Sequence, residues 1–229
     1  MQLTELSETG VRSAVVRLSH PTKQQVIVLF PMLHFADPKF YRKVARRLRK
    51  LDVVVAEGFD RPSSTGYAIL LAGRLTRQRG VRRLTFQDID YEALGIPVIW
   101  PDRLWGNSRR RDSWTFREWV GIVCLLPVLV LAMVVGGSTV LLTSNKEFSS
   151  ETPQLSGLVS AYRDQRLLAA LDRVVDGLDR ALDQWEGRPV TVTVGVVYGA
   201  AHMPAVIRHL TDRRGFYPDG SKWLDVMVF

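Results

Sequence analysis

The chain has 229 residues, of which 46% are hydrophobic and 24% charged; this excludes a disordered protein and leaves enough apolar surface for one large or two small domains. The formal net charge of +8 indicates an anionic partner, such as nucleic acid or a lipid headgroup surface. Cys124 is the only cysteine, which excludes an internal disulfide.

The first quarter of the chain alternates strand and helix patterns. Its first ten residues carry neither a basic segment nor an apolar one, so we expect no cleaved signal peptide and a cytoplasmic location. Residues 11–18 and 26–30 predict two strands of a hairpin. An Asp-Pro pair opens a predicted helix over 39–50, and the apolar run 51–56 predicts a central parallel strand.

The remaining patterns continue this alternation and predict an α/β fold in a single domain, 1–229. In chain order they indicate a helix over 65–78, a short strand over 81–86, a loop over 97–103, one or two amphipathic helices over 156–185, a buried strand over 190–198, a helix over 203–213 and a last strand over 223–229. Ligands of such folds bind at the carboxyl ends of the parallel strands.

Residues 119–142 contain no charged side chain. As one helix they would span roughly 36 Å, enough to cross a hydrocarbon core. Arg109–Arg111 and Arg117 precede this run, which by the positive-inside rule places its amino-terminal side in the cytoplasm. Pro127 and the Gly136-Gly137 pair would allow a hairpin of two short helices instead.

Four structures remain open for this apolar run: a single membrane crossing, a membrane hairpin, an in-plane anchor and a buried core helix. A single crossing would put His34 and His202 on opposite sides of the membrane, where they could not share a site. We expect membrane association, with the buried core helix as the alternative.

Three polar residues follow predicted strands and are the strongest candidates for chemistry. His34 comes shortly after the strand 26–30, Glu57 directly after 51–56, and His202 ends a Gly-Ala-Ala-His turn after 190–198. Two imidazoles and one carboxylate suit a divalent metal ion with an open coordination position. The same set suits acid–base catalysis without a metal.

Each candidate also has a simpler explanation. A histidine at a strand end is often structural, and Glu57 would also be stable in an ion pair with an arginine. Arg163 and Asp164 lie on an amphipathic helix and either point into the site or form a solvated pair. Gln87 follows a short strand, where turn chemistry is common.

These residues resemble the TraB/PrgY/TIKI family, whose members carry two Gly-x-x-His motifs and a strand-end glutamate. Residues 196–204, Val-Val-Tyr-Gly-Ala-Ala-His-Met-Pro, match the second motif. Residues 28–34, Val-Leu-Phe-Pro-Met-Leu-His, match the first, with Pro31 in place of the glycine. Tyr-Arg-Asp at 162–164 looks like the family's Glu-Arg-Asp, with Tyr162 in place of the acid.

The resemblance covers roughly residues 26–216 and implies an α/β fold with a mixed sheet, flanking helices and a helical insertion between two halves. That insertion coincides with the apolar run 119–142. Family members include proteins described as metal-dependent proteases and others tied to pheromone shutdown. The resemblance therefore favours a hydrolase without specifying its substrate.

The leading hypothesis is a membrane-associated, metal-dependent hydrolase such as a peptidase. His34, Glu57 and His202 would hold manganese, cobalt or zinc, which would polarise a carbonyl and activate water. Glu57 would also act in catalysis, and Arg163 would stabilise developing negative charge. Asp164 and Gln87 are secondary candidates for the same site.

Two rival hypotheses remain. The first is a non-catalytic, membrane-associated regulatory module that binds a peptide or small molecule, which Pro31 and Tyr162 favour. The second, a nucleic-acid binder, ranks last, because the basic helix 39–50 has no stacking aromatics on its polar face. Membrane lipid is thus the expected anionic partner, and we expect no nucleic acid.

Overall fold

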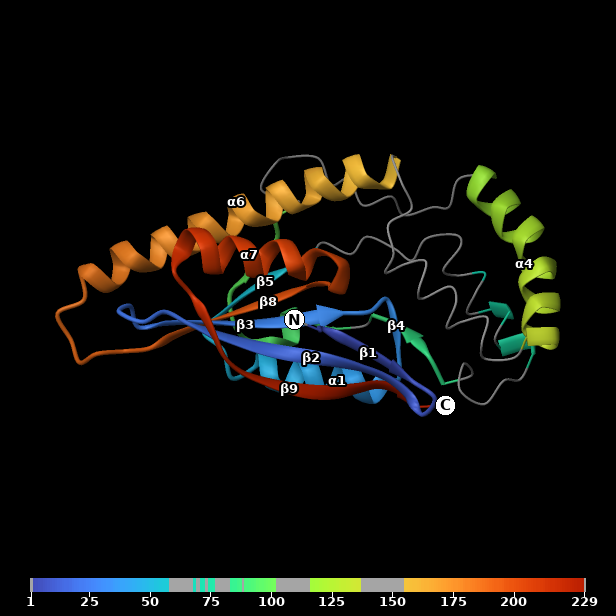
Figure 1. Cartoon of the computed structure of the whole chain (residues 1–229), viewed down its shortest axis with the longest axis horizontal. Helices are drawn as coiled ribbons and strands as arrows, with labels where there is room; N and C mark the ends of the chain where they lie inside the picture. The colour runs from blue at the N-terminus through green and yellow to red at the C-terminus, as the bar shows by residue number, and fades with distance from the viewer. Residues whose placement is uncertain are drawn as a thin grey trace.

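A computed structural model describes residues 2–57, 68, 71–72, 74–76, 83–87, 89–101, 116–136 and 155–228. The structure is α/β, with a mixed sheet between helices (Figure 1). Helix α1 (Pro38–Leu48) packs on one face of the sheet, and α6 (Leu155–Asp183) and α7 (Met203–Arg214) pack on the other. The predicted α/β class, mixed sheet and flanking helices are confirmed.

Four parallel strands form the half of the sheet that carries the candidate site. The order is β3 (Gln25–Met32), β8 (Val192–Gly199), β5 (Val53–Ala56) and β7 (Val98–Ile99), each pairing with the next. Strands β8 and β5 are rich in valine, as expected for parallel strands covered on both faces. Because these strands run in one direction, their carboxyl ends meet at one edge of the sheet.

The other half of the sheet is antiparallel and centres on β2 (Gly10–Ser19). Strand β9 (Tyr217–Val228) pairs with the whole of β2, while β1 (Thr4–Ser7) and β3 pair with its first and second parts. The β2–β3 pairing confirms the predicted hairpin. Pro31 lies within β3 opposite Tyr198, and its carbonyl accepts a hydrogen bond of 2.7 Å from the buried Ser13 hydroxyl.

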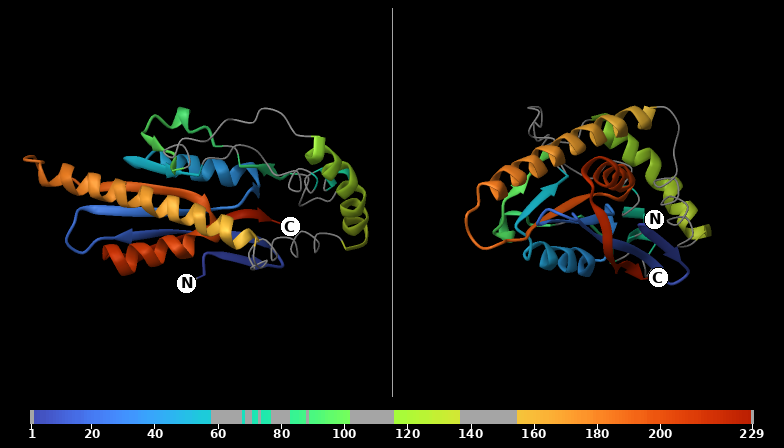
Figure 2. Two further views of the ribbon diagram at one scale, coloured as in Figure 1. Left: turned by 90° about the horizontal axis from the view of Figure 1, so that it is seen from above. Right: turned by 60° about the vertical axis from the view of Figure 1, so that its left-hand side comes forward.

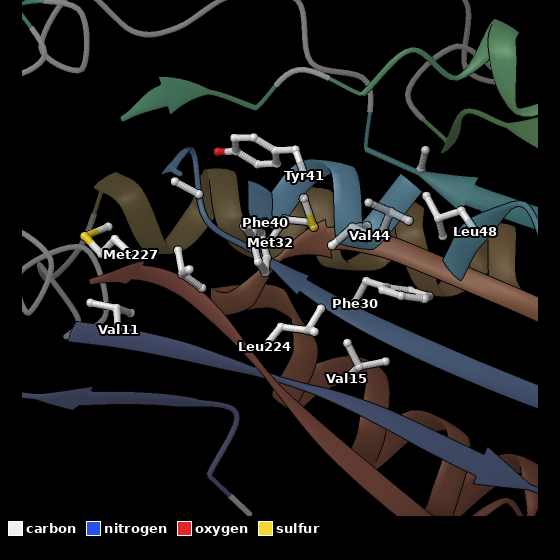
Figure 3. Packing of buried hydrophobic residues seen from close by; sticks show 14 of the residues in the cluster. Val11, Val15, Phe30, Met32, Phe40, Tyr41, Val44, Leu48, Leu224 and Met227 are labelled. Carbon is white, nitrogen blue, oxygen red and sulfur yellow. The ribbon is translucent and has the colours of Figure 1, made fainter. Parts of the chain in front are cut away.

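Helix α1 is stabilised by capping at its first turn and by burial of its apolar face. The Asp37 carboxylate accepts a hydrogen bond of 2.7 Å from the Lys39 backbone N–H, and Pro38 occupies the first turn. Its buried side chains pack on the sheet face shown in Figure 3. These side chains are Phe40, Tyr41, Val44 and Leu48.

Helices α6 and α7 cover the opposite face through apolar residues at helical spacing. Leu167, Leu171 and Val175 of α6 are buried in one cluster with residues of β8. Gly215, with a φ of 73°, ends α7 in the left-handed conformation that glycine adopts without strain. The predicted helices 156–185 and 203–213 are thus confirmed, the first as one long helix.

A polar cluster joins α6 to α7 near the surface. Arg214 lies 2.7 Å from Asp172 through both Nε and Nη2, and 2.7 Å from Asp176 through Nη1. His209 Nε2 lies 2.8 Å from the same oxygen of Asp172. The hydrogen bond from Arg214 lowers the pKa of the Asp176 carboxyl below its ordinary value.

Three predicted elements need correction. The predicted loop 97–103 contains β7, because Val98 and Ile99 pair with β5. The predicted strand 81–86 is reduced to β6 (Thr85–Phe86), which pairs with β4 (Phe35–Ala36) in a separate small sheet. The last strand begins at Tyr217, because β2 is long enough to pair with all of it. Most of the predicted helix 65–78 lies outside the described residues.

The apolar run 119–142 is described only as far as residue 136, within α4 (Phe116–Gly136). Among the helices of the described ranges, none has the length and apolarity needed to cross a membrane.

Replacing Arg214 by glutamine should lower the free energy of unfolding by about 1–2 kcal/mol, because two charged hydrogen bonds between α6 and α7, to Asp172 and Asp176, are lost. The lowered pKa of Asp176 means that this stabilisation is present above the ordinary carboxyl pKa and is lost as the pH falls through the folded-state value. Urea unfolding of both proteins should therefore show a difference that shrinks in acid.

Arg17→Gln is the matched control, since Arg17 is 55% exposed and meets only Asp219, at 3.2 Å. Exposed pairs of this kind contribute roughly 0–1 kcal/mol. Equal losses for the two variants would contradict the assigned role of the Arg214 cluster.

Candidate functional site

The three strands that precede His34, Glu57 and His202 are neighbours in the sheet. Met32, at the end of β3, pairs with Gly199, at the end of β8, and Ala56, at the end of β5, pairs with Val197. The predicted adjacency of these strands is confirmed. Side chains that follow them start from one edge of the sheet, where ligands of parallel α/β folds bind.

Glu57 is a buried carboxylate, only 3% exposed, directly after β5. Its Oε2 accepts a hydrogen bond of 2.7 Å from the Gly199 backbone N–H, and its own N–H donates to the Val197 carbonyl at 2.9 Å. A charge-assisted bond of this kind offsets part of the cost of burying the carboxylate. Glu57 therefore ties the end of β5 to the end of β8.

Gly199 lies next to the side chains of both Glu57 and His202. A Cβ atom on Gly199 would lie 3.4 Å from Glu57 Oε2 and 3.5 Å from His202 Cδ2. The two side chains are therefore no further apart than the sum of these distances. A Cβ atom would fit here in ordinary van der Waals contact, whereas a larger side chain would extend toward the carboxylate and the imidazole.

His202 is oriented by an acid from the opposite layer. Its imidazole is 8% exposed, and its Nδ1 lies 2.5 Å from Oδ1 of Asp164 on α6. The Tyr198 ring packs edge-on against the imidazole at 5.6 Å. An ionised aspartate can only accept, so Nδ1 carries a proton, and in the neutral imidazole Nε2 is then left as an acceptor. This arrangement suits a general base and equally suits a metal ligand.

Asp164 therefore contacts His202, which agrees with the first of the two expectations for it, that it points into the site rather than forming a solvated pair. The structure describes the helical backbone of α6 at Tyr162 and Arg163 but not their side chains. The roles predicted for these side chains therefore lie outside the described part of the structure. The helical pattern placed Asp164 on α6 but could not select its partner, which is 38 residues away.

Tyr91 and Gln87 extend the polar surroundings of Glu57. The Tyr91 hydroxyl is buried and makes no hydrogen bond of standard geometry within the described residues. Burial raises the pKa of Tyr91 well above its ordinary value; interaction with the Gln87 side chain lowers it, and the nearby Glu57 charge raises it further. Tyr91 therefore remains a neutral hydrogen-bond donor, a role that no sequence motif indicated.

His34 is exposed, and its backbone is fixed from two sides. The Gln87 N–H donates to the His34 carbonyl at 2.9 Å, and the Tyr41 hydroxyl donates to the Leu33 carbonyl at 2.9 Å. Gln87 thus contributes to this edge of the sheet through its backbone as well as its side chain.

The predicted metal site requires His34, Glu57 and His202 to converge. Within the described residues, which include all three, no group of three histidine, cysteine, aspartate or glutamate side chains could hold a metal ion. The donors as placed do not fit a three-ligand site, and the Glu57 carboxylate already accepts from Gly199. Metal binding by this set stays a prediction.

Comparisons with protein-family models, with curated proteins and with solved structures found no match to this chain. The resemblance to the TraB/PrgY/TIKI family therefore rests on the motifs around His34, Glu57 and His202 alone.

Replacing Tyr91 by phenylalanine should reduce the alkaline loss of stability. The folded state holds the Tyr91 proton more tightly than the unfolded state does, so stability is full below the ordinary tyrosine pKa of about 10 and declines above it. The unfolding free energy of Tyr91→Phe should rise relative to wild type between about pH 8 and pH 11.

Tyr217→Phe is the control, because Tyr217 is 48% exposed on β9. Urea unfolding at several alkaline pH values measures both variants against wild type. An equal pH dependence for the two would show that the Tyr91 hydroxyl is not held in an environment that disfavours its ionisation.

Proposed function

We propose that this chain is a hydrolase that acts on a carbonyl substrate such as a peptide, with His202 as its general base. The observation that carries the proposal is the 2.5 Å contact between His202 Nδ1 and Asp164, beside the buried Glu57 at the strand ends. The family resemblance, which includes proteases, supports the same reaction class. A carboxylate that orients a histidine is the usual arrangement for activating water or a hydroxyl group.

In this mechanism His202 Nε2 accepts a proton from water while the water oxygen bonds to the substrate carbonyl carbon. Asp164 remains ionised, holds the Nδ1–H tautomer and stabilises the imidazolium that forms. His202 then returns the proton to the leaving group as the bond to that group breaks. The histidine ends neutral, ready for another turnover.

Glu57 and Tyr91 complete the proposed site on the β5 side. The Glu57 charge is fixed by Gly199, and it favours positive charge that develops on His202. The neutral Tyr91 hydroxyl is buried near this charge and shielded from solvent, so it contributes to the polarity around Glu57 rather than contacting a substrate. Stabilisation of negative charge on the substrate stays assigned to Arg163, as proposed from the sequence.

The metal-dependent form of the proposal assigns His34, Glu57 and His202 as ligands. Such an ion would supply Lewis-acid polarisation of the carbonyl and a more acidic bound water. The roles given above to Asp164, His202 and Tyr91 do not require it. Measuring the divalent metal content of the purified protein, and its activity after chelation, separates the two forms.

A non-catalytic binding module is the second candidate. It is favoured by the lack of a three-donor set among the described residues and by the engagement of Glu57 with Gly199. The same polar edge would then bind a peptide through hydrogen bonds without breaking it.

The chain offers a matched pair of variants to test the catalytic role. His202 and His209 each contact an aspartate of α6, at 2.5 Å and 2.8 Å, but only His202 lies at the strand ends. His202→Gln should lower turnover of fluorogenic peptide and ester substrates by about 10²–10⁴-fold. Asp164→Asn should lower it substantially as well, whereas His209→Gln should affect stability only.

Circular dichroism and urea unfolding of each variant establish that a loss of turnover is not a loss of folding. Equal turnover by wild type and His202→Gln, or binding of peptides by wild type without cleavage, would favour the non-catalytic module.

A further inference from the structure

Helix α4 exposes a stripe of apolar side chains along its length. The exposed large side chains recur at helical spacing, so they share one face of the helix. Four of them are between 63% and 67% exposed: Val123 at 63%, Val128 at 63%, Leu131 at 66% and Val134 at 67%. Val135 is 81% exposed, and Val120 begins the stripe at 44%.

The other face of α4 already has a partner within the chain. Leu126, Leu129 and Val130 are partly buried and pack against the core cluster that contains α1. A helix that covers a core normally presents polar residues to water on its outer side. In α4 the outer side is apolar as well, and a contiguous apolar surface of this kind marks an interaction site.

The composition of the stripe and its surroundings selects a lipid bilayer as the partner. From Val120 to Gly136 the sequence has no charged residue and no tryptophan, tyrosine or arginine, the residues that most often recognise a protein partner. Protein interfaces concentrate such groups at their energetic centres, whereas acyl chains require none. Arg109–Arg111 precede α4 in a chain of net charge +8, which complements anionic headgroups.

We propose that α4 docks in the plane of an anionic membrane, with its exposed stripe among the acyl chains and its other face on the protein. An in-plane position leaves the contacts of Leu126, Leu129 and Val130 with the core cluster intact. The inference is independent of whether the strand-end site is catalytic.

Docking through α4 would turn one end of the molecule toward the membrane. Figures 1 and 2 show α4 at the end where β4 lies, and β4 directly follows His34 in the chain. Substrates held at the membrane surface would thereby be brought to the same end of the protein.

The single cysteine provides a direct probe, because Cys124 is exposed on α4. An environment-sensitive fluorophore on Cys124 should shift to the blue when vesicles of phosphatidylcholine and phosphatidylserine are added, and lipid-borne quenchers should reduce its emission. The control carries the fluorophore on Asp183→Cys in a Cys124→Ser background, at the exposed end of α6. It should show neither effect.

Vesicle sedimentation of paired variants tests the stripe itself. Leu131→Asp combined with Val135→Asp should weaken binding to the anionic vesicles by at least about tenfold. Val190→Asp, at a side chain 45% exposed away from α4, should leave binding unchanged. Binding to phosphatidylcholine alone should be weaker, since only the apolar contribution remains.

A Cys124 fluorophore that stays in water with both vesicle types would overturn the proposal. So would a stable dimer, measured by light scattering without lipid, that dissociates in the Leu131→Asp, Val135→Asp variant. In that outcome a second copy of the chain covers the stripe.

Discussion

The hydrogen bond between the buried Glu57 carboxylate and the Gly199 N–H is the constraint on which the candidate site depends. It joins the ends of β5 and β8, and it fixes a charge beside the turn that leads to His202. Parallel pairing makes the bond geometrically accessible, because both strands end at one edge of the sheet. Gly199 lies next to both the carboxylate and the imidazole, since a Cβ atom on it would contact both side chains. The pairing of β5 with β8 therefore also determines where the Glu57 carboxylate lies.

The two helices on the far face of the sheet connect the site to the stability of the domain. Helix α6 supplies Asp164 to His202 at one point and Asp172 to His209 and Arg214 at another. The two histidines face α6 from the same side of this interface, one in the short turn before α7 and the other within α7 itself. The His202 contact lies at the strand ends, within the candidate site, whereas the His209 contact lies away from them and joins the two helices.

Much of the fold could be predicted from the sequence, because long apolar runs and helical spacing are local signals. The strands containing Val16, Ile27, Val55 and Val196 were found in this way. Strand β7 was missed, since two residues between prolines show no alternation and become a strand only through pairing with β5. Asp164 was only a secondary candidate for the site and Tyr91 was not a candidate at all, because their proximity to His202 and Glu57 depends on how distant segments pack. The convergence of three metal ligands was inferred from strand ends alone, which position the backbone and leave the side-chain directions open.

The central claim is that Asp164 holds His202 with its proton on Nδ1 and Nε2 available to a substrate. Nitrogen NMR of the protein labelled in its four histidines measures this directly, with the His202 signals assigned by loss in His202→Gln. We expect a strongly deshielded proton on Nδ1 that disappears in Asp164→Asn, and an Nε2 that carries no proton in the neutral imidazole. A His202 whose proton resides on Nε2, and whose signals do not change in Asp164→Asn, would contradict the account.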